Sequence, residues 1–234
     1  MLVALVALAA STATGTADAQ PSASASAAQS SPSAGAAPSV AQMHSFLVEV
    51  ARDVNGFWAS AFQAGHVPYR PPKLVIVDAQ QSVQSRCDSK AEPGTLENSF
   101  WCSRDQTVYL FVKFLTTIYR QDGDFAVAYV IAHEWGHHVQ AELGIWRIVA
   151  QRHVPTIQTE TQADCFAGVW SRSAFDRGLV DEADLQQIIA ATDFVGDAQG
   201  VPSREAGAHG QSGLRSAWFM NGFRRGNVGD CKTF

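Results

Sequence analysis

The chain has 234 residues, enough for one medium-sized domain with its own hydrophobic core. Its formal net charge at pH 7 is −5 and it has no basic run, so it lacks the electrostatic footprint of a nucleic-acid-binding protein. Beyond the first residues, no apolar stretch reaches membrane-spanning length without a charge or a turn signal, so we expect a mature form that does not span a membrane.

The N-terminal segment has the features of an export signal. Residues 1–10 are almost wholly apolar but too short to cross a bilayer, and Ala17-Asp18-Ala19 gives the small-x-small pattern of a cleavage site, although a positively charged start is missing. Residues 20–40 are rich in Ser, Ala and Pro and have no hydrophobic period, which is typical of a disordered linker. We predict a signal peptide over 1–19, a linker over 20–40 and one folded domain over 41–234, in a bacterial protein that is secreted or held in the cell envelope.

The folded part reads as a small sheet with several helices. Apolar periodicity and turn residues predict a helix over 43–64, a strand over 73–77, a loop from 87 to 102, and a strand over 106–112 that runs into a short helix to 115. They then predict a helix from 125 to about 143, capped by Asp124 and stopped by Gly144, and a helix over 156–177. A helix from 182 to 194, capped by Asp181, and an irregular Gly-rich tail from 199 complete the chain. The pattern predicts one α+β domain, rich in helices with a small sheet. Trp135 and Trp146 are expected in its core.

The third predicted helix carries the sequence His133-Glu134-Trp135-Gly136-His137. Residues four apart lie on one helical face, so the two imidazoles converge on one point and make half of a tetrahedral zinc site. A glutamate next to the first ligand can take a proton from a zinc-bound water. The alternative is a buried helix whose histidines are satisfied by core hydrogen bonds. His138 points elsewhere, so we expect it to be structural or exposed.

A catalytic zinc needs a third protein ligand and one open position for water. The following predicted helix offers Glu160 and Asp164, again four residues apart on one face. We expect Glu160 to be the third ligand and Asp164 to accept a hydrogen bond from a ligand imidazole, which would fix its tautomer and orientation. An exposed pair of surface acids is the alternative.

The four cysteines are Cys87, Cys102, Cys165 and Cys231. An even number in an exported protein favours disulfides, and four cysteines allow three pairings. We favour Cys87–Cys102, which closes a local loop, and Cys165–Cys231, which ties the C-terminal tail to the core. A thiolate zinc site is the less favoured reading because no C-x-x-C element is present.

Three motifs, in order, resemble the bacterial neutral zinc metallopeptidase family over roughly residues 74–234. They are His133–Gln140, Glu160–Gly168 and the tail from His209 through Arg215 to Phe234. The resemblance implies a zincin-like core with one catalytic Zn²⁺, and the Glu-x-x-x-Asp element is similar to that of other zincins in which the glutamate binds zinc. By analogy with a downstream His…Arg element in related zincins, His209 is a candidate catalytic donor to the oxyanion, with Arg215 in a supporting role. The alternative places His209 in a surface loop with no catalytic role.

Together these features predict a zinc-dependent peptidase that acts on a peptide or protein substrate, with endopeptidase activity as the default. A zinc-activated water would attack the scissile carbonyl, with Glu134 as general base. The strand over 106–111 is a candidate for pairing with an extended substrate. The main rival is a secreted, catalytically silent zinc-binding adaptor, which would need the metal ligands but not Glu134. A secreted module stabilised only by disulfides and aromatic residues would bind no stoichiometric zinc.

Overall fold

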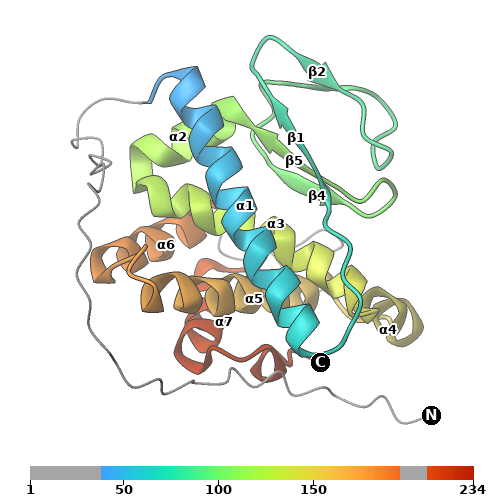
Figure 1. The fold of residues 1–234 in the computed structure, drawn as a ribbon. Helices are drawn as coiled ribbons and strands as arrows, with labels where there is room; N and C mark the ends of the chain where they lie inside the picture. The colour runs from blue at the N-terminus through green and yellow to red at the C-terminus, as the bar shows by residue number, and fades with distance from the viewer. Residues whose placement is uncertain (1–37, 196–209) are drawn as a thin grey trace, which may run out of the picture.

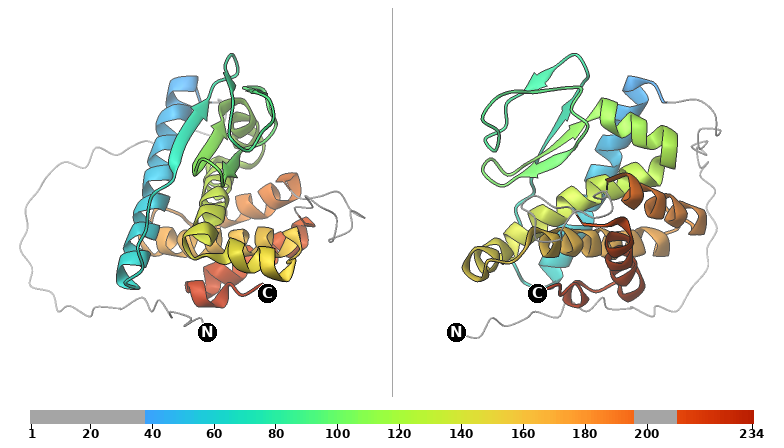
Figure 2. Two further views of the ribbon diagram at one scale, coloured as in Figure 1. Left: turned by 90° about the vertical axis from the view of Figure 1, so that its right-hand side faces the viewer. Right: turned by 180° about the vertical axis from the view of Figure 1, so that it is seen from behind.

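The structure is a computed structural model that describes residues 38–195 and 210–234. Its helices form the larger part of the molecule, and a small sheet covers one end, as expected for an α+β protein (Figure 1). Figure 2 shows the same division from two further directions, with the strands at the opposite end of the molecule from the last helix. The elements are α1 (Val40–Ala64), β1 (Lys73–Val77), β2 (Ser82–Val83), β3 (Glu92–Pro93), β4 (Phe100–Cys102), β5 (Thr107–Phe111), α2 (Val112–Asp122), α3 (Asp124–Glu142), α4 (Ile145–Arg152), α5 (Thr156–Asp176), α6 (Glu182–Val195), α7 (Ser212–Arg225) and a short 3₁₀ turn, η1 (Val228–Asp230).

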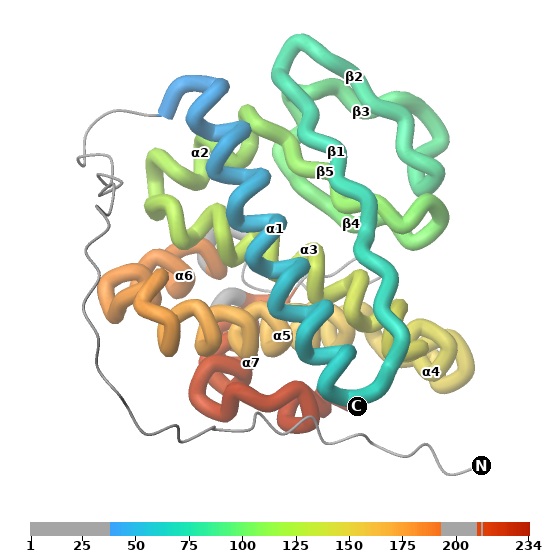
Figure 3. Tube along the Cα trace, viewed as in Figure 1, coloured from blue at the N-terminus to red at the C-terminus, as the bar shows by residue number. Residues whose placement is uncertain are grey.

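Helix α1 is set by its cap and its apolar stripe. The Ser39 hydroxyl accepts from the Gln42 N–H while the Gln42 side chain accepts from the Ser39 N–H, which is a reciprocal capping box. Buried residues then recur every three or four positions: Met43, Leu47, Ala51, Val54, Trp58 and Phe62. This face packs on α3 and α5, and Figure 3 shows α1 crossing the helical layer beside the sheet.

The three-stranded sheet has the order β1-β5-β4. β1 runs parallel to β5, and β4 runs antiparallel to β5 with Trp101 opposite Val108. All five residues of β5 are buried, which fits its central place. The prediction that the strand over 106–111 pairs with substrate is therefore wrong, because both of its edges are occupied by neighbouring strands. The free edge that packs against α3, the helix of His133 and His137, belongs to β4, which lies in the segment that we expected to be a loop.

Helix α3 is the centre of the molecule. Helices α1, α2, α5 and α6 and strands of the sheet pack around it, so its residues are buried on all sides rather than on one stripe. It begins at Asp124 after Gly123, whose φ of +94° suits glycine, so Asp124 is the first helical residue rather than the cap that we predicted. Gly136 brings α3 close to Ala163 of α5, since a Cβ at this glycine would lie 2.9 Å from the Ala163 Cα.

Two helices were not expected from the sequence. The tail after residue 199 was predicted to be irregular, but α7 occupies Ser212–Arg225 and packs closely on α5. Glycines allow this contact: a Cβ on Gly168 would lie 2.0 Å from the Phe219 carbonyl oxygen, and a Cβ on Gly222 would lie 2.0 Å from the Cys165 carbonyl oxygen. Helix α4 is the second, and none of its residues is fully buried.

Two disulfides join Cys87 to Cys102 and Cys165 to Cys231, the pairing that we favoured. The first attaches the segment around β3 to β4, and the second attaches the C-terminal residues to α5. No helix in the described ranges combines the length and the apolar composition that crossing a membrane requires.

Candidate metal centre

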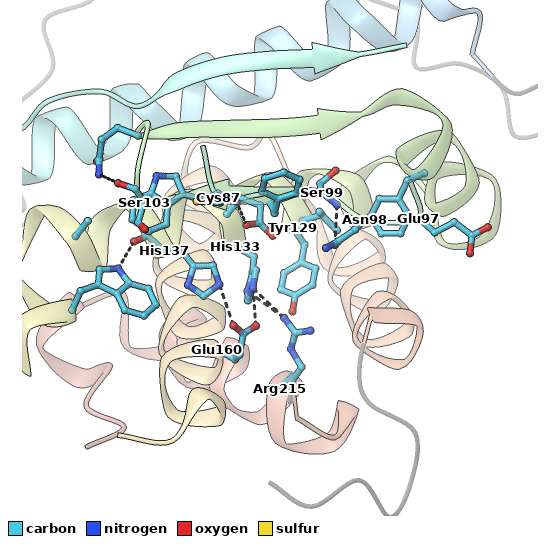
Figure 4. A pocket seen from close by; sticks show the side chains of 18 of the residues that line it. Cys87, Glu97, Asn98, Ser99, Ser103, Tyr129, His133, His137, Glu160 and Arg215 are labelled. Atoms are coloured by element: carbon cyan, nitrogen blue, oxygen red, sulfur yellow. Dashed lines mark hydrogen bonds and ion pairs between the residues drawn. The ribbon is translucent and has the colours of Figure 1, made fainter. Parts of the chain in front are cut away.

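Helices α3 and α5 bring together three side chains that could bind a metal ion. His133 and His137 project from successive turns of α3, and Glu160 reaches them from α5 (Figure 4). His133 Nε2 lies 3.4 Å from Glu160 Oε2, and His137 Nε2 lies 3.4 Å from Glu160 Oε1. One ligand atom from each residue can be chosen so that all three lie within 4.8 Å of one another.

This geometry fits zinc. Zn²⁺ binds imidazole nitrogen and carboxylate oxygen at about 2.0–2.2 Å in a tetrahedron, which separates neighbouring ligand atoms by roughly 3.4 Å. Each imidazole nitrogen lies at that separation from one oxygen of the Glu160 carboxylate, His133 Nε2 from Oε2 and His137 Nε2 from Oε1. Two imidazoles and one carboxylate are also a ligand set that catalytic zinc sites use, with the fourth position left open.

The His133 ring is held from behind by Asp164. His133 Nδ1 lies 2.8 Å from Asp164 Oδ1, so a proton on Nδ1 leaves Nε2 with its lone pair toward Glu160. The same carboxylate accepts from the Tyr129 hydroxyl at 2.7 Å and from two nitrogens of Arg215, at 2.9 Å to Oδ2 and 2.8 Å to Oδ1. Asp164 is fully buried and Arg215 is 2% exposed. Asp164 is thus a buried anion that accepts from four donor atoms on three residues.

The charges in this group shift one another's pKa values. Burial alone would raise the pKa of Asp164, but Arg215 and His133 lower it by a larger amount, to about 2, so the carboxylate stays ionised. Burial alone would lower the pKa of His133, but the Asp164 carboxylate raises it by a larger amount, to about 9. Burial likewise lowers the pKa of His137, and Glu160 outweighs that effect and raises it. In the metal-free protein His133 therefore holds, at neutral pH, a proton that a metal ion must displace.

Glu134 lies beside the three ligands without belonging to their cluster. Its Oε2 accepts a hydrogen bond from the backbone N–H of Trp101 in β4 at 2.8 Å, so this edge strand holds the carboxylate in place. Burial raises the pKa of Glu134, and the nearby His133 and His137 act in the opposite direction. A carboxylate with a raised pKa is better matched to proton transfer near neutral pH.

The centre opens into a cleft of about 990 Å³. Its lining includes β4, the ligand face of α3 and Trp146 of α4, with Phe114 and Val130 among its apolar residues. Trp146 was expected in the core, but it is half-buried in this cleft. Its indole N–H donates to the His137 carbonyl at 3.3 Å and its ring stacks near Trp101, with centroids 6.2 Å apart.

The structure places the other predicted residues as follows. His138 is not exposed: it is 1% accessible, and its Nε2 lies 2.8 Å from the Arg70 carbonyl oxygen, so it is structural. Arg215 lies beside the metal-ligand residues and contacts Asp164. His209 lies outside the described residues. Sequence reasoning did not identify Tyr129, although it lies four residues before His133 and therefore on the same face of α3.

Fold and site together define a helix-rich α+β protein with a candidate zinc centre built from a His-Glu-x-x-His helix and a glutamate of a second helix. A family model described as "Putative neutral zinc metallopeptidase" matches residues 1–234, and the chain belongs to this family.

Relatives support the same assignment. The chain is 32% identical over 216 residues to the uncharacterized protein YpfJ of Escherichia coli strain K12, covering 85% of this chain and 74% of YpfJ. It is 34% identical over 159 residues to the uncharacterized protein Rv2575 of Mycobacterium tuberculosis strain H37Rv, covering 58% of this chain and 54% of the relative. No solved structure matches the chain.

Proposed function

We propose that this chain is a zinc-dependent peptidase in which His133, His137 and Glu160 hold one zinc ion and Glu134 acts as the general base. The observation that carries the proposal is the position of Glu134. A purely structural or adaptor site needs the three ligands, but it has no need of Glu134, a further buried carboxylate held beside them by the Trp101 N–H.

Zinc bound by these residues would supply a Lewis acid that polarises a carbonyl and lowers the pKa of water. The protein groups divide the remaining work. Glu134 accepts a proton from the nucleophile and passes it to the leaving amine, since its raised pKa favours the protonated form between the two transfers. Asp164, which Arg215 and Tyr129 hold in place, keeps the His133 ring turned with Nε2 toward Glu160.

The substrate would lie along β4 in an extended conformation. The Trp101 N–H points at Glu134 rather than into the ladder with β5, so this edge of the sheet faces the metal ligands. Strand addition to such an edge uses main-chain hydrogen bonds and therefore accepts many sequences, while the cleft walls select side chains. Because the cleft passes Trp146 as well as Phe114, we propose that it accepts chain on both sides of the scissile bond, as an endopeptidase requires.

We also propose that the protein works outside the cytoplasm. Both disulfides are of the kind that persists in oxidising compartments. The predicted signal peptide over 1–19 and residues 20–37 of the predicted linker over 20–40 lie outside the described residues, and both segments remain predictions from the sequence.

One experiment tests the proposal: zinc content and cleavage of a fluorogenic peptide blocked at both ends, measured for the wild type and for Glu134→Gln. We expect one zinc per chain in both proteins and a loss of about 10²–10⁴-fold in turnover for the variant. Stoichiometric zinc without cleavage by the wild type of several peptides, some with blocked and some with free ends, would favour the adaptor. Absence of stoichiometric zinc would reject both functions. The blocked ends separate the alternatives further, because an exopeptidase would not cut this substrate.

A further inference from the structure

Within the described residues, the side chain that contacts Nδ1 of the second histidine of the centre, His137, is an amide rather than a carboxylate. His137 Nδ1 lies 3.0 Å from Oε1 of Gln140, one turn further along α3. The Gln140 amide nitrogen donates to the Thr159 carbonyl oxygen at 2.7 Å and to Gln162 Oε1 at 3.2 Å. The Gln162 amide nitrogen then donates to the carbonyl oxygen of Cys231 at 2.8 Å. A continuous chain of hydrogen bonds therefore runs from His137 to the C-terminal tail.

Two backbone carbonyl groups fix which atom donates and which accepts in every hydrogen bond of this chain. The backbone carbonyls of Thr159 and Cys231 only accept, so both amides must turn their NH₂ groups toward them. That orientation leaves Gln140 Oε1 facing the imidazole, and an amide oxygen also only accepts. The proton of the neutral His137 ring is then held on Nδ1, and the lone pair of Nε2 is directed at Glu160, where a metal ligand needs it.

The terminal acceptor is itself held in place by covalent and polar contacts. Cys231 is 2% exposed and is bonded to Cys165 of α5, the residue that follows Asp164. On either side of it, the Asp230 carbonyl accepts from Asn221 at 3.0 Å and the Thr233 hydroxyl donates to the Gln158 carbonyl at 2.6 Å. The tail is thus attached to α5 and α7 at the point where the chain of hydrogen bonds ends.

We propose that Gln140, Gln162 and the C-terminal tail orient His137 for metal binding, and that the Cys165–Cys231 disulfide keeps the last acceptor of this chain in position. They are positioning residues, because none of them reaches the substrate cleft or the ligand cluster. The inference rests on the metal site of the proposed function. It adds that a segment at the far end of the sequence sets the metal affinity of α3.

The test is the apparent zinc affinity, measured by competition with a chelator, for Gln140→Met, Gln162→Met and the double variant Cys165→Ala/Cys231→Ala. Loss of a group that orients a ligand typically lowers metal affinity 10- to 100-fold, and we expect each of the three to show such a loss. The control is Arg177→Met, which removes the ion pair with Asp53 of α1 and contacts neither this chain nor the cleft; it should bind zinc as the wild type does.

Gln140→Glu tests whether the acceptor at position 140 is enough without the rest of the chain of hydrogen bonds. A carboxylate still accepts from His137 Nδ1 but cannot donate to Thr159 or Gln162, so this variant breaks the link that Gln162→Met also breaks, and its zinc affinity should fall by a similar factor. Wild-type affinity in Gln162→Met and in the tail double variant would overturn the inference. So would a Gln140→Glu protein that binds zinc as tightly as the wild type. A wild type without stoichiometric zinc would reject the proposed function as well, whereas a zinc-loaded, active wild type with unaffected variants would reject only this inference.

Discussion

The glycine inside the metal-binding helix offers a direct test of how the centre is assembled. In Gly136→Ala the new methyl would lie 2.9 Å from both the Cα and the carbonyl oxygen of Ala163, and 3.1 Å from its Cβ. Ordinary contact begins near 3.4 Å, so α5 must retreat by about half an ångström. Two of these three atoms are backbone, and rotation of a side chain therefore cannot relieve the contact.

The expected cost follows from two opposing effects. Overpacking a tight interface costs about 1–3 kcal/mol, and replacing a helical glycine by alanine returns up to about 1 kcal/mol. We therefore expect a net loss of roughly 1–2 kcal/mol, or about 2–8 °C in Tm for a domain of this size. The same shift acts on the metal site, because Gly136 lies between His133 and His137 while Ala163 lies between Glu160 and Asp164. Functional sites tolerate displacements of only about 0.5 Å, so zinc affinity should fall about tenfold or more.

Calorimetric unfolding of the metal-free protein and chelator competition measure the two effects. The control is Gly56→Ala in α1, where the residue is exposed and no atom lies within 4 Å of the new methyl. That variant should be stabilised by about 0.5–1 kcal/mol and bind zinc normally. If Gly136→Ala gains stability like the control and keeps its zinc affinity, the close approach of α3 and α5 is not what sets the ligand geometry.

Three further predictions concern the same framework. Asp164→Asn keeps the side-chain shape but removes the charge that His133, Tyr129 and Arg215 all contact, so urea unfolding should show a loss of about 3–5 kcal/mol, and an unchanged midpoint would contradict it. Gly168→Ala places a methyl 2.0 Å from the Phe219 carbonyl oxygen, against 2.9 Å for Gly136→Ala, and should therefore destabilise the protein more in the same calorimetric assay; an equal or smaller loss would argue against the tight contact of α5 with α7. Burial alone would lower the pKa of His133, but the effect of Asp164 is larger and raises it to about 9, so the metal-free ring is protonated at pH 7. Zinc affinity should therefore rise with pH up to about 9, with proton release detectable by titration calorimetry in buffers of different ionisation enthalpy. A flat affinity profile between pH 7 and 9 would refute this prediction.

The helices of the metal centre could be predicted because their sequence signals are local. The apolar run before His133 and the i, i+4 spacing of Glu160 and Asp164 indicate two helices with functional faces, and the structure places both acidic groups at His133. The partners of these groups were harder to find. Tyr129 and Gln140 lie one turn to either side of the two histidines, so helical spacing would have identified them had it been applied in both directions.

The missed elements have a different cause. Glycine lowers helix propensity, and this led us to expect an irregular tail, yet Gly222 is what allows α7 to approach α5. The stability of α7 comes from its packing on α5, which a local stretch of sequence does not reveal. Strand β4 has only three residues, too few for a sequence pattern, and it is defined by its pairing with β5 and by the hydrogen bond from the Trp101 N–H to Glu134. The central position of β5 likewise depends on strand order, which the sequence pattern does not contain.

The Cys87–Cys102 bond has one more consequence, for the durability of the cleft. The segment between these cysteines is mostly irregular and surface-exposed, and it borders the cleft through Glu97 and Asn98, so it is the kind of chain that peptidases cut. A single cut between residues 88 and 99 would leave the two fragments covalently joined through Cys102, the last residue of the strand that faces Glu134. A nicked molecule would migrate as one chain until its disulfides were reduced, and it could retain its edge strand while damaged.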